Sequence, residues 1–145
     1  MESRKLLRTL SFISLALGVL LYLFYRPLTL KYIDWLDNII PVEVIRNLQH
    51  SVYPSRDYLS NFLIFSLPDG LWVFSYVSFM RAIWFESSNR IRFVWFALIP
   101  VIAIGSEMIQ KLGILQGTYD LYDAMAYLFC AFLPFTFALG KAQTA

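Results

Sequence analysis

The sequence predicts an all-α integral membrane protein, a four-helix transmembrane bundle with short amphipathic interfacial helices in its first outer loop. The first observation is composition: of 145 residues, 59% are hydrophobic and 15% are charged, whereas soluble domains carry roughly 25% charged residues. The second observation is four apolar stretches, each close to the roughly 20 residues with which a helix crosses a bilayer. We therefore expect lipid to surround most of the chain.

The four stretches cover about residues 9–25, 58–80, 93–112 and 121–139. Helices are expected because lipid offers no hydrogen-bond partners to backbone groups, and the stretches are too long for barrel strands. The first follows Arg4, Lys5 and Arg8 as a signal peptide would, but bulky residues occupy positions 22–25, where small residues would mark a cleavage site. We interpret it as a retained anchor and residues 1–145 as a single domain.

The distribution of Lys and Arg predicts that both termini are cytoplasmic. Counted on alternate sides, seven accompany the termini and five lie on the other side, and the positive-inside rule places the richer side in the cytoplasm. The seven are Arg4, Lys5, Arg8, Arg81, Arg90, Arg92 and Lys141, and the five are Arg26, Lys31, Arg46, Arg56 and Lys111. Residues 26–56 then form an outer loop.

Apolar residues recur at helical spacing in this loop. They are Ile33, Leu36, Ile39 and Ile40, followed by Val42, Ile45, Leu48 and Val52. Such a pattern is typical of amphipathic helices that lie flat on a membrane surface. The alternative is a packed lid over the bundle that has no ligand of its own.

Polar side chains gather where the second, third and fourth spans have their outer ends. They form three pairs at spacings of three or four residues: Asp57 and Asn61, Glu107 and Gln110, and Asp120 and Asp123. This spacing predicts that each pair shares one helical face. Charged groups at membrane depth usually face the protein interior or a water-filled cavity, so we expect these six residues to line one outward-facing site.

Structural explanations compete with this prediction to different degrees. Asp57, Asp120 and Asp123 fall in the first turns of their expected helices, where capping and the helix dipole favour a carboxylate. Glu107 lies toward a helix C-terminus, where negative charge is disfavoured. Its alternative role is a salt bridge to Lys111, four residues further on.

Asp69 lies midway along the second expected span, between Pro68 and Gly70, with no oppositely charged residue three or four positions away. Because an isolated ionised carboxylate is costly in lipid, it must be protonated or paired across helices, and we expect the neutral form. Pro68 removes a backbone donor, so that a protonated Asp69 can donate to a freed carbonyl. A proton or ion step is the alternative for this intramembrane acid.

Two segments carry a family resemblance. The stretch Ser106-Glu107-Met108-Ile109-Gln110, followed by Gly117-Thr118-Tyr119-Asp120-Leu121-Tyr122-Asp123, resembles the VanZ-like membrane proteins, which have a Glu-x-x-Gln pair before an Asp-rich helix start. The run Asn61-Phe62-Leu63-Ile64-Phe65, with Pro68 and Gly70, is similar to the family's pattern on the preceding helix. The resemblance covers about residues 57–135. It departs where Gln116 and Gly117 stand near the place of an arginine, and Tyr127 in that of an asparagine.

The resemblance implies a multi-pass protein of the bacterial inner (cytoplasmic) membrane, in a cell-envelope family named for antibiotic (teicoplanin) resistance. We expect its outward-facing carboxylate and amide site to bind or process a lipid-linked envelope component or an amphiphilic glycopeptide. Glu107, Asp120 and Asp123 are candidate ligands for Mg²⁺ or Ca²⁺, since hard cations prefer oxygen. No nucleophile motif accompanies these residues, so the sequence leaves catalysis open.

Other partners and functions follow from the remaining features. Membrane lipids or another membrane protein are expected partners, whereas a net charge of +2 without a basic run gives no reason to expect nucleic acid. Cys130 and His50 are single residues of their kinds, which excludes a Cys/His zinc cluster within the chain. A small structural or regulatory membrane subunit is one alternative function, and a proton or ion pathway through Asp69 is another.

Overall fold

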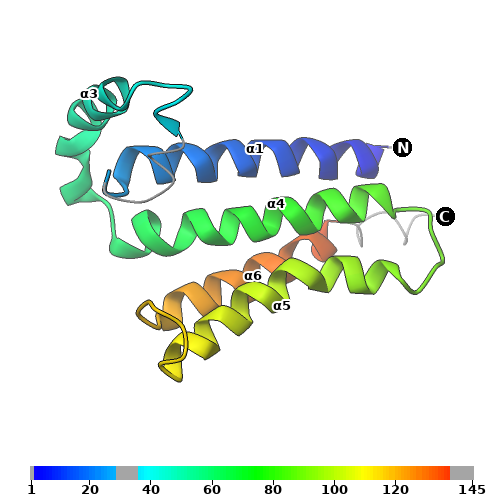
Figure 1. Cartoon of the computed structure of the whole chain (residues 1–145). Helices are drawn as coiled ribbons and strands as arrows, with labels where there is room; N and C mark the ends of the chain where they lie inside the picture. Colours follow the sequence, from blue (N-terminus) through cyan, green and yellow to red (C-terminus); the bar gives the residue numbers. More distant parts are fainter. Residues whose placement is uncertain (1, 29–35, 138–145) are drawn as a thin grey trace.

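Four long helices form the body of the molecule (Figure 1). The computed structural model describes residues 2–28 and 36–137, which form helices and loops without a strand. The long helices are α1 (Glu2–Tyr25), α4 (Leu67–Ile83), α5 (Arg92–Lys111) and α6 (Leu121–Thr136). Helix α4 lies in the middle, with α1 on one side and α5 and α6 on the other. The all-α prediction is therefore confirmed for the described residues.

Three helical segments are long and apolar enough to cross a membrane: Glu2–Tyr25, Phe62–Ile83 and Arg92–Lys111. They match the first three predicted spans, although the first begins earlier and the second begins at residue 62 rather than 58. Helix α6 is apolar but has 16 residues, which at 1.5 Å per residue is about 24 Å, short of a hydrocarbon core of about 30 Å. The predicted end of this span, residues 138–139, lies outside the described residues.

Small side chains on α1 bring it close to α4. Leu7, Ser11, Ser14 and Gly18 are the buried residues of α1 and recur at intervals of three or four. The hydroxyl of Ser11 donates to the backbone carbonyl of Ser75 on α4 at 2.9 Å. Such contacts replace the hydrophobic effect as the source of helix association in lipid. On α4, the apolar core includes Val73 and Val77, which are buried on either side of Ser75 in the chain.

The chain enters α4 through irregular turns. A 3-10 helix, η1 (Tyr53–Tyr58), ends at Leu59, whose backbone is extended (φ −100°, ψ 136°). A π-helical turn, η2 (Phe62–Ser66), then leads into α4. Pro68 follows this turn and has no N–H to donate, so a regular α-helical bonding pattern is interrupted here. The extended backbone at Leu59, ahead of this turn, is what keeps the second span from extending back to residue 58.

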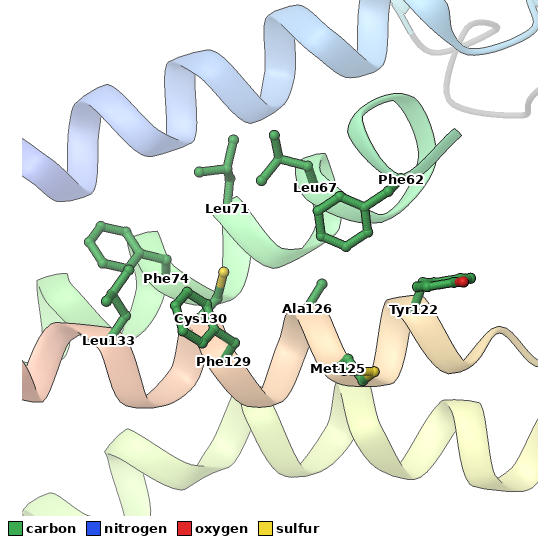
Figure 2. Close-up of a pocket in the computed structure, with 10 residues that line it drawn as sticks. All are labelled: Phe62, Leu67, Leu71, Phe74, Tyr122, Met125, Ala126, Phe129, Cys130 and Leu133. Atoms are coloured by element: carbon green, nitrogen blue, oxygen red, sulfur yellow. The ribbon is translucent and has the colours of Figure 1, made fainter. Parts of the chain in front are cut away.

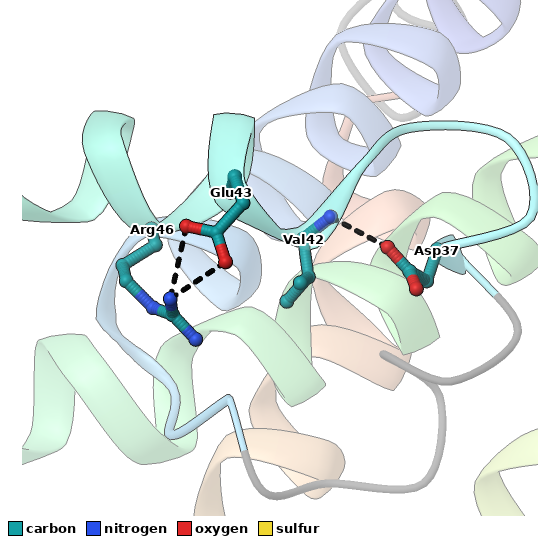
Figure 3. A network of polar contacts seen from close by, with 4 residues as sticks. All are labelled: Asp37, Val42, Glu43 and Arg46. Atoms are coloured by element: carbon teal, nitrogen blue, oxygen red, sulfur yellow. Dashed lines mark hydrogen bonds and ion pairs between the residues drawn. The ribbon is translucent and has the colours of Figure 1, made fainter.

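Helix α3 (Val42–Val52) confirms a helical segment in the first connecting loop. Figure 3 shows its N-terminus, where the Asp37 carboxylate accepts from the Val42 N–H at 2.6 Å, and where Arg46 donates to Glu43 at 2.8 and 2.9 Å. The Gln49 amide of α3 donates to the Leu23 and Arg26 carbonyls at 2.7 and 2.9 Å, which ties α3 to the end of α1. Of the earlier predicted segment, Ile33 lies outside the described residues, whereas Leu36, Ile39 and Ile40 form a turn that precedes α3.

Candidate functional site

The C-terminal end of α5 and the N-terminal end of α6 lie next to each other at the end of the bundle where α1 finishes and α4 begins (Figure 1). This is the arrangement that the alternating direction of the spans predicts. Glu107, Gln110, Asp120 and Asp123 therefore come together at one end of the molecule.

Glu107 is the most buried of the predicted site residues, with 5% of its surface exposed. Its Oε2 accepts a hydrogen bond from the backbone N–H of Asp120 at 3.2 Å, which links α5 to the start of α6. A buried carboxylate near a helix C-terminus is disfavoured both by desolvation and by the helix dipole. One backbone hydrogen bond leaves most of its acceptor capacity unused.

Lys111 does not supply the cation that Glu107 lacks. Its side chain is exposed, and its Nζ lies 5.0 Å from the centre of the Tyr119 ring. Among the described residues, no ion pair joins Lys111 to Glu107. The salt-bridge explanation of Glu107 is therefore absent from this structure.

Asp120 and Asp123 occupy different positions in the first turn of α6. Asp120 is the N-cap, and its carboxylate accepts from the Tyr122 N–H at 2.8 Å. This is the capping role that the sequence left open for it. Asp123 is half-buried, and Ser66 of η2 is its hydrogen-bonding neighbour. Its Oδ1 is buried without a hydrogen-bond partner among the described residues.

Gln110 packs against the loop that leads to Asp120. A Cβ atom added at Gly117 would lie 2.8 Å from Cδ of the Gln110 side chain, and Gly117 has φ +143°. A glycine is needed here both for the backbone conformation and for the close approach. Gln110 therefore helps to place the start of α6 next to α5.

Asp69 is paired across helices, which is one of the two states that the sequence allowed. Nη2 of Arg26 lies 3.0 Å from Asp69 Oδ2 and also donates to the Phe65 carbonyl at 2.8 Å. Burial favours the neutral carboxyl and the guanidinium favours the ionised one, so the pairing across helices is confirmed while the neutral form of Asp69 stays a prediction. The carbonyl of the irregular turn is satisfied by Arg26 instead.

Arg26 and Tyr127 are site residues that sequence reasoning missed. Asp69, Glu107 and Asp123 are all close enough to interact electrostatically with the Tyr127 hydroxyl, as is Arg26. We call Arg26, Asp69, Glu107, Asp123 and Tyr127 the acidic cluster. The position of Arg26, directly after the first apolar span and level with the start of the second, was the available signal.

Asp57 and Asn61 are not the matched pair that the sequence predicted. Asp57 lies in η1, whereas Asn61 precedes η2, and the extended backbone at Leu59 separates them. The prediction that they share one helical face is therefore wrong. Both side chains are exposed, and Asn61 makes no side-chain cap.

The geometry does not support a preformed metal centre. Within the described residues, no three His, Cys, Asp or Glu side chains come together in a way that could hold a metal ion. Asp120 is directed to the backbone of its own helix, which separates its role from that of Glu107 and Asp123. The three candidate ligands therefore do not form one site for Mg²⁺ or Ca²⁺.

An apolar groove of about 460 Å³ runs between α4 and α6 (Figure 2). Its walls include Leu67 and Leu71 from α4 and Met125 and Phe129 from α6. Phe62 and Tyr122 line one end, with ring centres 6.4 Å apart. Tyr122 adjoins Asp123 in the chain, so the groove begins at the same end of the bundle as the acidic cluster.

No family model, no curated protein and no solved structure matches this chain. The resemblance to the VanZ-like proteins therefore stays a prediction, and the residues of the site are interpreted from their chemistry.

Proposed function

We propose that this protein crosses a bacterial inner membrane with four helices, and that it binds an amphiphile at its outer end. The acidic cluster receives the polar head, and the groove between α4 and α6 receives the apolar tail. The observation that carries the proposal is Glu107, a buried carboxylate that has no cationic partner among the described residues. Such a group is costly to keep, and a ligand that donates hydrogen bonds or carries positive charge would compensate for it.

The charges of the acidic cluster favour a particular kind of head group. The acidic cluster contains three carboxylates, those of Asp69, Glu107 and Asp123, and one guanidinium, that of Arg26, which is already bonded to Asp69 and to the Phe65 carbonyl. The cluster therefore attracts hydrogen-bond donors and cations, such as sugar hydroxyl and ammonium groups. A phosphate head would meet repulsion from Glu107 and Asp123.

The groove suits a hydrocarbon tail. The residues that line it are apolar or aromatic along its whole length (Figure 2). Ligand sites of this kind combine an apolar pocket with a few polar groups that orient the ligand. In a membrane the tail would enter from the lipid phase while the head stays at the outer surface.

The predicted VanZ-like relationship suggests which amphiphile this is. A lipid-linked envelope component or an amphiphilic glycopeptide has sugar or amine groups on an apolar body, which matches the two parts of the site. Binding requires no reactive residue, and we propose no catalytic step.

A photoreactive amphiphile tests this function. The probe is an alkyl glucosaminide that carries a diazirine in its alkyl chain, added to protein purified in lipid nanodiscs. We expect crosslinks on Met125 and Phe129, and about tenfold weaker labelling for Glu107→Gln and Asp123→Asn, because a hydrogen bond to a charged group contributes roughly 1.5–3 kcal/mol.

Asp57→Asn is the matched control, since it removes an exposed carboxylate at the same end of the chain's second span. It should leave the labelling unchanged. Labelling that is equal in all three variants, or that maps away from α4 and α6, would show that the cluster and groove do not bind amphiphiles.

The alternative of a proton pathway through Asp69 has less support. Asp69, Glu107 and Asp123 interact at one end of the bundle, whereas a pathway needs groups along the length of the membrane. A structural role accounts for the Arg26–Asp69 pair, which joins the end of α1 to α4, and for the hydrogen bond between Glu107 and the start of α6. It does not account for a buried Glu107 carboxylate without a cationic partner among the described residues.

A further inference from the structure

A separate hollow lies at the other end of the bundle, away from the acidic cluster. It has a volume of about 300 Å³ and is lined by Arg81, Arg92 and aromatic side chains that include Trp84, Phe96 and Phe135. Arg81 belongs to the last turn of α4, and Arg92 begins α5. Two guanidinium groups thus line one small space between neighbouring helix ends.

Each of the two guanidinium groups has N–H donors that its contacts within the protein do not use. Arg81 donates to the Pro134 carbonyl, and its Cζ lies 4.5 Å from the centre of the Phe135 ring. Arg92 donates to the Ser87 carbonyl, and its Nε is buried without a hydrogen-bond partner among the described residues. Because an arginine has five N–H donors, these contacts fix the positions of the two guanidinium groups and still leave N–H donors for a ligand.

No carboxylate of a described residue is paired with either of these two arginines. Glu86 is the sole acidic residue between positions 70 and 106, and its side chain is exposed. Two part-buried cations without an ion-pair partner among the described residues indicate an anionic ligand.

We propose that this hollow binds a phosphate group, and that the phosphate belongs to a lipid at the cytoplasmic surface of the membrane. Arg92 stands at the N-terminus of α5, where the helix dipole adds to the positive charge. Guanidinium groups suit phosphate because their parallel donors match its oxygens. Trp84 and Phe96 supply the aromatic surface that membrane interfaces favour. This site is independent of the amphiphile site at the outer end.

Binding in a phosphate-free detergent tests the proposal. Protein in dodecyl maltoside is titrated with dihexanoyl phosphatidic acid, with glycerol 3-phosphate and with dihexanoylglycerol, and occupancy is read by native mass spectrometry. We expect phosphatidic acid to bind and dihexanoylglycerol, which lacks the phosphate, not to bind. At least tenfold weaker binding of glycerol 3-phosphate supports a lipid as the source, whereas equal binding would overturn the lipid assignment and leave a soluble phosphate.

Charge variants locate the bound phosphate. Arg92→Gln should weaken phosphatidic acid binding about tenfold, whereas Arg90→Gln, which removes an exposed charge from the same loop, should change it less than twofold. Arg81→Lys keeps the charge but loses the paired donors, and we expect a smaller loss of roughly threefold. Equal effects of Arg90→Gln and Arg92→Gln, or equal binding of dihexanoylglycerol, would overturn the proposal. Far-ultraviolet circular dichroism verifies that each variant is folded.

Discussion

Arg26 and Asp69 form an ion pair although 43 residues separate them in the chain. Helical spacing identifies partners that are three or four residues apart on one helix. It cannot identify a partner on another helix that a connecting loop places nearby. The same limit applies to Ser66 and Asp123, which meet between η2 and α6. By contrast, the contact between Glu107 and the start of α6 could be expected, because the loop between α5 and α6 is short.

Breaking the Arg26–Asp69 pair should destabilise the protein. The side chains are 20% and 17% exposed, so Arg26→Gln leaves a largely buried carboxylate without its cation and should cost about 2 kcal/mol of unfolding free energy. The double variant Arg26→Gln/Asp69→Asn should recover part of that loss. Chemical unfolding in detergent measures it, and additive effects of the two single changes would show that the pair does not couple.

Gly117 should be more sensitive than Gly113 to replacement by alanine. Both have positive φ values, +143° and +72°, but a Cβ at Gly117 would also meet the Gln110 side chain, whereas one at Gly113 would meet nothing within 4 Å. We expect Gly113→Ala to cost about 1 kcal/mol and Gly117→Ala about 2–3 kcal/mol. Thermal unfolding compares them, and equal losses would mean that contact with Gln110 contributes nothing.

At the scale of elements, the start of the second span departed most from expectation. Its apolar residues continue back to Tyr58, so composition predicts one helix, but η1, Leu59 and the π-helical turn divide the segment. Pro68 was expected to disrupt the helix, but the irregular backbone lies in the residues that precede it, in η1, at Leu59 and in η2. This is why Asp57 and Asn61 were wrongly given one helical face while the pairs on α5 and α6 were placed correctly at one end.

Gly70 controls how closely α4 approaches α6. An added Cβ would lie 3.1 Å from Cys130 Sγ and 3.3 Å from the Ala126 carbonyl oxygen. Gly70→Ala should therefore separate the helices and cost about 1–3 kcal/mol. Gly105→Ala is the control, because nothing lies within 4 Å of its added Cβ, and alanine should stabilise α5 by about 0.5–1 kcal/mol. Unfolding curves that rank the two variants the other way would contradict this packing.

At the scale of the whole molecule, composition and span length were sufficient to predict an all-helical structure, and the alternating direction of the spans placed Glu107, Asp120 and Asp123 at one end of it. They could not establish whether α6 crosses the membrane, because its 16 described helical residues are fewer than a typical span. The predicted orientation in the membrane rested on the distribution of Lys and Arg alone, because the same helix packing is compatible with either direction of insertion. These two features need measurements in a membrane.

Cysteine labelling should place α3 outside and the loop between α4 and α5 inside. His50→Cys and Ser88→Cys, each in a Cys130→Ala background, both introduce a thiol at an exposed position. In bacterial spheroplasts, an impermeant maleimide should label His50→Cys at once and Ser88→Cys only after permeabilisation, as the positive-inside rule predicts. The opposite pattern would invert the protein and move the acidic cluster to the cytoplasmic face.

The most direct test of the ligand-binding account is the melting temperature of Glu107→Gln in nanodiscs without added amphiphile. A glutamine oxygen can still accept the Asp120 N–H, while the uncompensated buried charge is removed. If Glu107 is kept for a ligand, the variant should melt within about 2 °C of the parent or above it. A fall of more than about 4 °C, restored by a simultaneous Lys111→Met, would instead show that Glu107 serves a structural ion pair.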